Sequence, residues 1–253
     1  MIPFPIISTY GNIAPEKGNW WKGDELIAFD SEIAKDVLGN QGEFTDYTGQ
    51  TIESNKWSGN VYCSLGPETG FEYGNGIRIP AFAYLYNKNI NPSFLLNSWS
   101  LDFWTYQNPI STLWNMQSTA LNVSGNAQPV STGNRFLFGA YSDDSSQSYV
   151  GIWNNVGVSG SYFLPNEYKT IWTSTQWVHS AIQYDSTDNT YYLFENGIMK
   201  YSFIYANKAV NIVNFYTGIN NVGSTGNVYI ERYRLRSGLQ FNKSGFATSD
   251  IYG

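Results

Sequence analysis

The sequence contains one cysteine, one histidine and no long apolar run. Because Cys63 has no second cysteine to pair with, an internal disulfide is excluded, and we expect its side chain to act as a small buried hydrophobe. The single histidine, His179, excludes zinc sites built from several histidines and leaves one candidate base for a serine-dependent triad. No stretch of about 18 apolar residues occurs, so we expect no membrane-spanning helix.

Charged side chains are also scarce: they make up 13% of the chain, and the formal net charge is −6. We do not expect nucleic acid as a partner of such an acidic chain, because nucleic-acid-binding proteins gather basic residues on one face. The first residues, Met-Ile-Pro-Phe-Pro-Ile-Ile-Ser, have neither a basic segment nor an uninterrupted apolar stretch. They do not resemble a signal peptide, and we expect synthesis in a cytoplasm.

Aromatic residues, in contrast, are abundant, with 9 Trp, 20 Tyr and 15 Phe among 253 residues. A chain of this length and composition can bury large apolar faces without disulfides or metals. Few segments have helical periodicity. The one short helix that we predict spans residues 31–38, with Ser31 as its N-cap and Gly39 as its stop.

An antiparallel meander of three strands is the clearest local prediction. Residues 177–185 alternate with the two-residue period of a strand. After a polar turn, residues 190–195 form a second run of β-branched and aromatic side chains. Asn196-Gly197 supplies the left-handed backbone that a tight hairpin turn needs, and residues 198–204 lead away as the third strand.

Two segments of this meander, Trp-x-His-x-Ala at residues 177–181 and Tyr-Leu-Phe-x-Asn-Gly at residues 192–197, resemble the central signature of concanavalin A-like domains of the laminin-G-like type. Further segments that resemble the family follow in its order, at residues 24–30 with 45–49, 70–80, 99–104, and 229–235 with Gly238 and Phe246. The resemblance implies an all-β fold, a concanavalin A-like jelly-roll sandwich of two antiparallel sheets. It covers residues 20–253, after an extended lead of residues 1–19.

Catalytic chemistry of the kind that this resemblance suggests has no matching motif in the sequence. Laminarinase-type glucanases of the fold carry Glu-x-Asp-x-x-Glu or a close variant on one strand, for acid and nucleophile roles. Asp30-Ser-Glu32 is the nearest pairing, and we interpret it as a turn or a helix cap. We interpret His179 as a packed, hydrogen-bonded core residue. We therefore predict no catalytic residue and no enzymatic activity.

Acidic turns provide the candidate metal ligands. Calcium is the ion that the resemblance implies, bound at a sheet rim by hard oxygen ligands. Asp143 and Asp144 follow one predicted strand, and Asp185 and Asp188 share a hairpin turn. The alternative is that these carboxylates are simply solvated, and we expect no other cofactor.

A row of basic residues, Arg232, Arg234 and Arg236, is the one unexpected charge pattern. Residues at this spacing face the same way on a strand, so three guanidinium groups would form a positive stripe. Two interpretations remain open. The stripe is a contact for an acidic partner or an anionic glycan, or it is a solvated outer face that is paired with local carboxylates.

Tryptophans outside the recognised strands are the other candidates for contact with a glycan or a partner protein. Pyranose rings stack on flat aromatic rings, and large aromatic faces are also common at subunit interfaces. The candidates are Trp20, Trp21, Trp57, Trp153 and Trp172.

The function that we predict from these features is a non-enzymatic structural or adhesion protein of a virion. A capsid decoration, a fibre or a tail component, made in the host cytoplasm, would use the module to contact other subunits or glycans. We expect the N-terminal lead up to Pro15 to contact a neighbouring subunit, because Pro3, Pro5 and Pro15 keep it extended. The alternatives are a carbohydrate-binding module of an extracellular surface protein and a glycan hydrolase with an unrecognised site.

Overall fold

A computed structural model describes a large part of the chain. The described residues are 20–21, 23–56, 62–66, 76–80, 83–87, 94, 97–107, 116–122, 135–140, 148–154, 160–162, 177–204, 214–219 and 227–248. For residues 116–122, 135–140, 148–154, 160–162 and 214–219 the description covers the backbone alone. The predicted N-terminal lead, residues 1–19, lies outside the described residues.

The predicted meander is confirmed. It consists of β12 (Val178–Asp185), β13 (Thr190–Glu195) and β14 (Ile198–Ile204), which pair antiparallel in this order. Asn196 and Gly197 have φ angles of 50° and 76°, the two positive values that a tight hairpin turn of this type requires.

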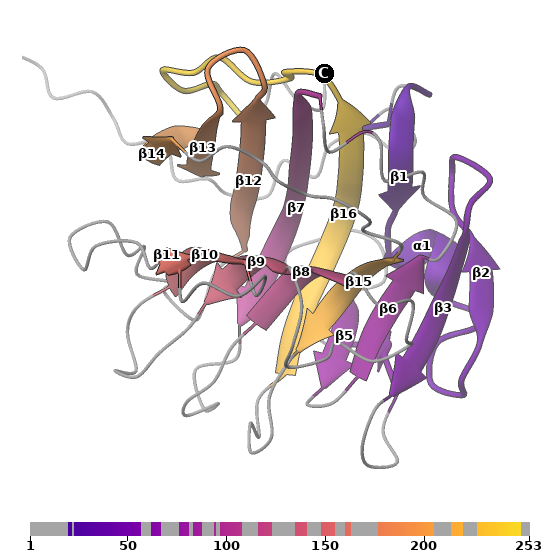
Figure 1. Ribbon diagram of the computed structural model, residues 1–253. Coiled ribbons are helices and arrows are strands. Elements are labelled where there is room, and N and C mark those ends of the chain that lie inside the picture. Colours follow the sequence, from indigo (N-terminus) through magenta and orange to yellow (C-terminus); the bar gives the residue numbers. More distant parts are fainter. Residues whose placement is uncertain are drawn as a thin grey trace, which may run out of the picture.

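One eight-stranded sheet, which we call sheet A, contains this meander (Figure 1). Its order is β14-β13-β12-β7-β16-β5-β4. The strands beyond the meander are β7 (Trp99–Gln107), β16 (Asn227–Ser237), β5 (Ile77–Pro80), β4 (Ser64–Leu65) and β1 (Glu25–Phe29). β16 is long enough to pair with β5 through its first half and with β1 through its second half, while β7 lies along its other edge.

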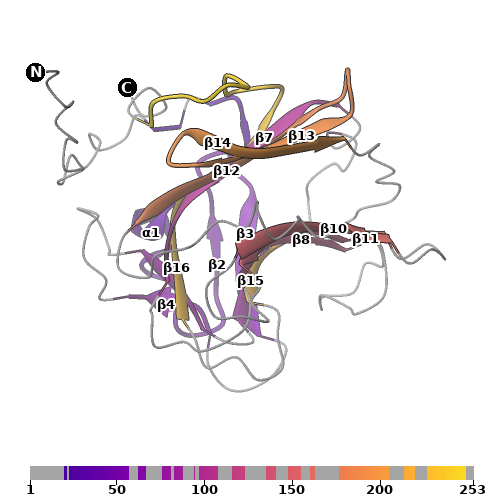
Figure 2. The same ribbon diagram turned by 90° about the vertical axis from the view of Figure 1, so that its left-hand side faces the viewer.

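The second eight-stranded sheet, sheet B, has the order β11-β10-β9-β8-β15-β6-β3-β2. Its strands are β2 (Glu43–Thr45), β3 (Thr51–Lys56), β6 (Ala83–Asn87), β8 (Met116–Asn122), β9 (Arg135–Ala140), β10 (Ser148–Asn154), β11 (Gly160–Tyr162) and β15 (Asn214–Ile219). Figure 2 shows the two sheets as separate layers. All described pairings are antiparallel, which confirms the predicted all-β sandwich.

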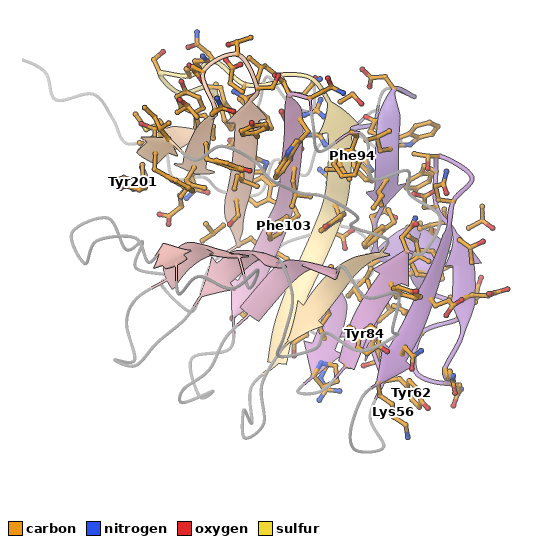
Figure 3. All side chains as sticks on the ribbon, in the orientation of Figure 1. Lys56, Tyr62, Tyr84, Phe94, Phe103 and Tyr201 are labelled. Carbon is orange, nitrogen blue, oxygen red and sulfur yellow. The ribbon has the colours of Figure 1, made fainter. Side chains whose placement is uncertain are left out.

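The main hydrophobic core lies between the two layers and takes buried side chains from both. Ile52 and Leu85 come from sheet B, whereas Phe103, labelled in Figure 3, comes from sheet A and stacks on Tyr233 with ring centroids 5.5 Å apart. Cys63 is fully buried in this core, as predicted.

The predicted helix is shorter than expected. The α-helix α1 (Ser31–Ala34) has four residues, and turns follow it up to Gly39, where φ is +103°. The N-cap is Asp30 and not Ser31: the Asp30 carboxylate accepts a hydrogen bond from Ile33 N at 3.1 Å. The prediction of Ser31 as the cap was wrong: Ser31 is the first residue of the helix, and its backbone N–H donates to Glu231. No helix in the described part of the chain is long and apolar enough to cross a bilayer.

The face of sheet A that points away from sheet B carries a second, smaller hydrophobic cluster. The C-terminal residues 238–248 cover part of it, as the yellow segment above β7 and β13 in Figure 2 shows. Phe241 and Phe246 stack on each other there, with ring centroids 4.5 Å apart. Gly197 has to be glycine, because a Cβ at that position would lie 1.9 Å from the Phe246 carbonyl oxygen. Both faces of sheet A are therefore partly closed to solvent.

Candidate functional site

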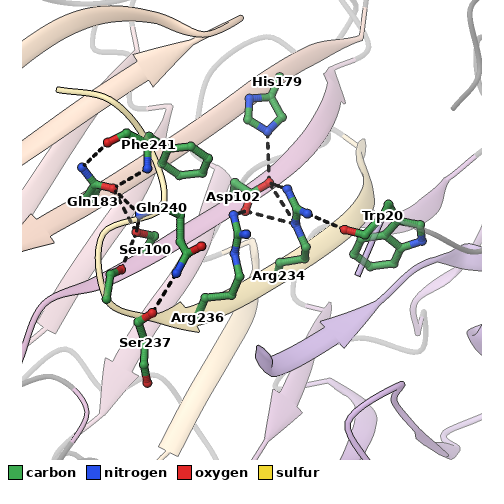
Figure 4. Close-up of polar contacts among 11 residues, drawn as sticks. Trp20, Ser100, Asp102, His179, Gln183, Arg234, Arg236, Ser237, Gln240 and Phe241 are labelled. Carbon is green, nitrogen blue, oxygen red and sulfur yellow. Dashed lines mark hydrogen bonds and ion pairs between the residues drawn. The ribbon is translucent and has the colours of Figure 1, made fainter. Parts of the chain in front are cut away.

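A buried cluster of charged side chains lies on this outer face of sheet A (Figure 4). Asp102 is its centre. Arg234 donates to the Asp102 carboxylate from Nε at 3.2 Å and from Nη2 at 2.6 Å, and Arg236 Nη2 donates at 3.3 Å. His179 Nε2 donates from the other side at 3.1 Å. Arg234 Nη1 also donates to the carbonyl oxygen of Trp20, so the cluster also binds the backbone at this residue.

The protonation states in this cluster follow from its geometry. Burial alone would raise the pKa of Asp102, but Arg234, the His179 hydrogen bond and Arg236 outweigh burial and hold this pKa well below its usual range. For His179 burial dominates and lowers the pKa, although Asp102 acts against it. The imidazole is therefore neutral at pH 7. The prediction of His179 as a packed, hydrogen-bonded core residue is confirmed.

A bulge in β16 explains where the three arginines lie. The pairing register with β7 shifts between Glu231 and Arg234, and Arg232 adopts a positive φ of 51°. Ile230 points into the main core, whereas Arg234 and Arg236 point to the opposite face. All three arginines are buried. The predicted exposure was therefore wrong, since a partner contact and a solvated face each require exposed side chains. The predicted pairing with local carboxylates is found for Arg234 and Arg236, which bind Asp102.

The C-terminal segment is held against the sheet by one glutamine (Figure 4). The Gln183 side-chain oxygen accepts hydrogen bonds from Gln240 N at 2.8 Å, Phe241 N at 2.9 Å and Ser100 Oγ at 3.1 Å. The Gln183 amide nitrogen donates to the Phe241 carbonyl oxygen at 3.1 Å. Because Gln183 and Ser100 are buried, these bonds satisfy polar groups that would otherwise carry a desolvation penalty.

A lysine of the C-terminal segment binds the hairpin turn that was a candidate calcium site. Lys243 Nζ lies 2.6 Å from Asp185 Oδ2 and 3.3 Å from Asp188 Oδ2. Lys243, first among the causes, lowers the pKa of Asp185 to about 2. A calcium ion bound to these two carboxylates would have to displace this ammonium group. The other candidates, Asp143 and Asp144, lie outside the described residues. Within the described part of the chain, no three His, Cys, Asp or Glu side chains gather in a way that could hold a metal.

Two further buried carboxylates have structural partners. Asp30 accepts from Tyr47 Oη at 2.9 Å as well as capping α1, which confirms its predicted role as a helix cap. Glu231 accepts from Ser31 N through both of its oxygens, at 3.1 and 3.3 Å. Burial, and then the nearby charge of Asp30, raise the pKa of Glu231 well above its usual value. Glu32, the other half of the nearest sequence pairing, forms an exposed ion pair with Lys35.

The tryptophans predicted as contact residues have different locations. Trp20 is 2% exposed, and its indole N–H donates to Asp30 Oδ2 at 3.2 Å, so the prediction of a surface contact through its ring was wrong. Trp21 is partly exposed and stacks on Tyr47, with ring centroids 5.1 Å apart. Trp153 lies in β10, where the backbone alone is described, and Trp57 and Trp172 lie outside the described residues.

An aromatic row that the sequence-based reasoning missed crosses the outer face of sheet A below the charged cluster. The strand register places Tyr106 opposite Tyr229, Tyr229 opposite Arg78, and Arg78 opposite Ser64. Trp177 precedes β12 and lies beside Tyr106, with ring centroids 5.7 Å apart. We call Trp177, Tyr106, Tyr229 and Arg78 the aromatic row. With strands about 4.8 Å apart, its three inter-strand steps cover about 14 Å.

Two glycines leave space for the rings of this row. A Cβ on Gly66 would lie 1.9 Å from the Tyr229 ring, and a Cβ on Gly76 would lie 2.5 Å from the end of the Trp177 ring. Tyr229 is buried as a result, with its ring 6.0 Å from that of Tyr106. Trp177, Tyr106 and Arg78 remain partly exposed, so they form the accessible part of the row.

The row was not predictable because it depends on strand pairing. Trp177 and Arg78 belong to two segments that we interpreted as strands, and Tyr106 lies just after a third, residues 99–104. Alternation does place Trp104 and Tyr106 on the same face as Asp102. However, only the pairing of β12 with β7, of β7 with β16 and of β16 with β5 brings Trp177 and Arg78 beside Tyr106 on that face.

The comparisons with known proteins identify similar folds. No protein-family model and no curated protein matches the sequence. Three similar solved structures are the binding domain of botulinum neurotoxin serotype D (14% identity, TM-score 0.56), that of botulinum neurotoxin DC in complex with SialylT (13%, 0.53), and that of botulinum neurotoxin DC in complex with rat synaptotagmin II (12%, 0.54). The matches cover 91%, 90% and 90% of this chain and 51%, 50% and 50% of those chains, respectively.

This chain therefore spans about half the length of the solved structures that it matches. At this level of identity the likeness concerns the fold, and the more specific concanavalin A-like and laminin-G-like assignment stays a resemblance in sequence. The comparisons and the two sheets together define the chain as an all-β sandwich with the fold of these binding domains.

Proposed function

We propose that this chain is a non-catalytic binding module that holds a glycan along the aromatic row of sheet A. The observation that carries the proposal is the position of two partly exposed rings, Trp177 and Tyr106, side by side on one face with Arg78 in the same row. Flat rings stack on the apolar face of a pyranose, and a few polar groups beside them orient the ligand.

The dimensions of the row favour a glycan over a protein partner. The row is one residue wide, whereas a stable protein interface buries about 1,000 Å² or more. Of the similar binding domains, one is in complex with SialylT and one with rat synaptotagmin II. These complexes support a binding role. A protein ligand is the second candidate, because Trp, Tyr and Arg are also the residues that dominate protein interfaces.

The row contains no carboxylate, whereas glycoside hydrolysis needs two that flank the bond to be cleaved. The buried acids of β7 and β16, the two central strands of the row, have structural partners: Asp102 binds Arg234 and Arg236, and Glu231 binds a backbone N–H. These features favour binding without catalysis over the hydrolase alternative.

The setting that we propose for the module is a virion structural or adhesion protein, with other subunits as further partners. The supporting features are those of the sequence, namely few charges and many aromatic residues. The alternative is a carbohydrate-binding module of a cellular surface protein. Purification of the protein in a stoichiometric particle supports the first setting, and its recovery from a cell envelope without particles supports the second.

A glycan panel tests the binding function. We expect the wild-type protein to bind a subset of immobilised oligosaccharides, and Trp177→Ala to weaken that binding by at least about tenfold because the variant removes the larger exposed ring of the row. Trp21→Ala is the matched control: it removes another partly exposed tryptophan, on a different part of the domain. Loss of binding in Trp21→Ala with full binding in Trp177→Ala would move the site to Trp21 and Tyr47. Thermal melting of each variant verifies that it is folded.

A further inference from the structure

Arg78 differs from the other basic residues in the described part of the chain. Each of the described lysines has an anionic or aromatic partner. Lys35 pairs with Glu32, Lys200 with Glu195 and Lys243 with Asp185, while Lys56 lies over the Tyr62 ring at 4.9 Å, as Figure 3 shows at the lower end of β3.

The other arginines with described side chains are buried and have anionic neighbours. Arg234 and Arg236 bind Asp102, and Arg232 lies near the charge of Glu231. For Arg78, in contrast, the contact within the described residues is a hydroxyl: Nη1 lies 3.5 Å from Ser64 Oγ, at the limit of a hydrogen bond. Its side chain is partly exposed, and no described carboxylate lies within ion-pair distance of it.

A partly exposed guanidinium with no carboxylate beside it among the described residues stands out because the protein is acidic. With 20 Asp and Glu against 14 Lys and Arg, carboxylates are available to pair with a surface arginine. Partial burial makes an unpaired charge costly, since it loses hydration without gaining a counter-charge. A ligand carboxylate would supply that charge, and the planar fork of an arginine matches a carboxylate with two parallel hydrogen bonds.

The apolar part of the row lies within reach of the same ligand. The end of the Trp177 ring contacts the backbone at Gly76, where an added Cβ would lie only 2.5 Å from it. Gly76 and Arg78 are two residues apart, a separation of at most about 7 Å along the chain. A ring stacked on Trp177 can therefore present a substituent to Arg78.

We propose that the glycan held by the aromatic row is acidic, with a sugar carboxylate on the Arg78 guanidinium and an adjoining pyranose face on Trp177. The proposal rests on the glycan-binding function and narrows its ligand class. A sulfate ester is the second source of the same anionic chemistry, and a panel with both groups separates the two.

Titration calorimetry with matched oligosaccharides tests this assignment. The probes are oligogalacturonate and its methyl ester, hyaluronan and sialyl oligosaccharides with their methyl esters, and chondroitin sulfate with its desulfated form. We expect wild type to bind at least one carboxylated probe about tenfold or more tightly than its ester, as removal of a charged hydrogen-bond partner predicts. We expect the difference to shrink as salt is added. Tighter binding of a sulfated probe than of every carboxylated probe would assign Arg78 to sulfate instead.

Two variants locate the effect. Arg78→Met keeps similar bulk and should remove the preference for the acid over the ester, because it weakens binding of the acid much more than binding of the ester. Arg78→Lys keeps the charge but not the fork, and should restore only part of the preference. An acid preference that survives in Arg78→Met would overturn the assignment of the carboxylate to Arg78. If acid and ester bind equally and binding still requires Trp177, the proposal of an acidic ligand is wrong but the glycan-binding function stands. If no probe binds, both proposals are contradicted.

Discussion

Replacing Asp102 by asparagine is expected to lower the free energy of unfolding by about 3–5 kcal/mol, the usual cost of removing one partner from a buried ion pair. Arg234, Arg236 and His179 all point to this carboxylate, so its removal leaves two buried guanidinium groups without their common anion. Urea denaturation of wild type and variant, monitored by tryptophan fluorescence, measures the difference.

The control for Asp102→Asn is Asp188→Asn, which removes a carboxylate from an exposed ion pair with Lys243 and is expected to change stability little. If Asp102→Asn does not fold, the double variant Asp102→Leu with Arg234→Met should recover part of the stability, because apolar replacement of a buried pair is often tolerated. An unfolding free energy of Asp102→Asn within about 1 kcal/mol of that of wild type would mean that the buried Asp102 cluster contributes little to the stability of the fold.

The same variant should change how stability depends on pH. The pKa of Asp102 is lower in the folded state than in the unfolded chain, where it is about 3.9. Its contribution is therefore fully present above this unfolded value and is lost as pH falls towards the folded value. As pH falls below about 4, protonation of Asp102 should lower the free energy of unfolding of wild type. The free energy of unfolding of Asp102→Asn should fall less steeply over the same pH range.

Replacing Trp20 by alanine is expected to cost about 3–5 kcal/mol, as for other buried tryptophans. The ring is almost fully buried, packs edge-on against Tyr47 with centroids 5.7 Å apart, and lies 5.8 Å from the Arg234 guanidinium carbon. Trp21→Ala is the matched control. The Trp21 ring is partly exposed, so its removal should lower the free energy of unfolding clearly less. Guanidinium-induced unfolding compares the two variants, and equal losses would show that burial does not distinguish these adjacent residues.

How much of the molecule was predictable depends on whether the signal is local. The β12–β14 meander and its Asn196-Gly197 turn were predicted because both signals, the two-residue alternation of side chains and the turn-forming residues, occur in consecutive residues. The burial of Cys63 and His179 followed from their residue type and strand context. In contrast, the N-cap of the helix was not predicted: Asp30 accepts from Ile33 N, and Ser31 N–H donates to Glu231, 200 residues away in the chain.

The candidate site was predicted poorly for the same physical reason. The arginine spacing in β16 indicated a shared face, which holds for Arg234 and Arg236, but a single residue with positive φ at Arg232 changes the face of the strand. Whether that face is exposed depends on residues 238–248, which fold back over it. No pattern within β16 contains this information.

Hydroxyl-radical footprinting with a bound glycan tests the central claim most directly, since it reports which side chains a ligand covers. The probe is the panel oligosaccharide that wild type binds most tightly, at a concentration well above its dissociation constant. Binding along the aromatic row predicts that oxidation of Trp177 and Tyr106 falls on addition of the glycan, while oxidation of Trp21 and Tyr47 does not change. Protection of Trp21 and Tyr47, with Trp177 and Tyr106 unchanged, would contradict the account.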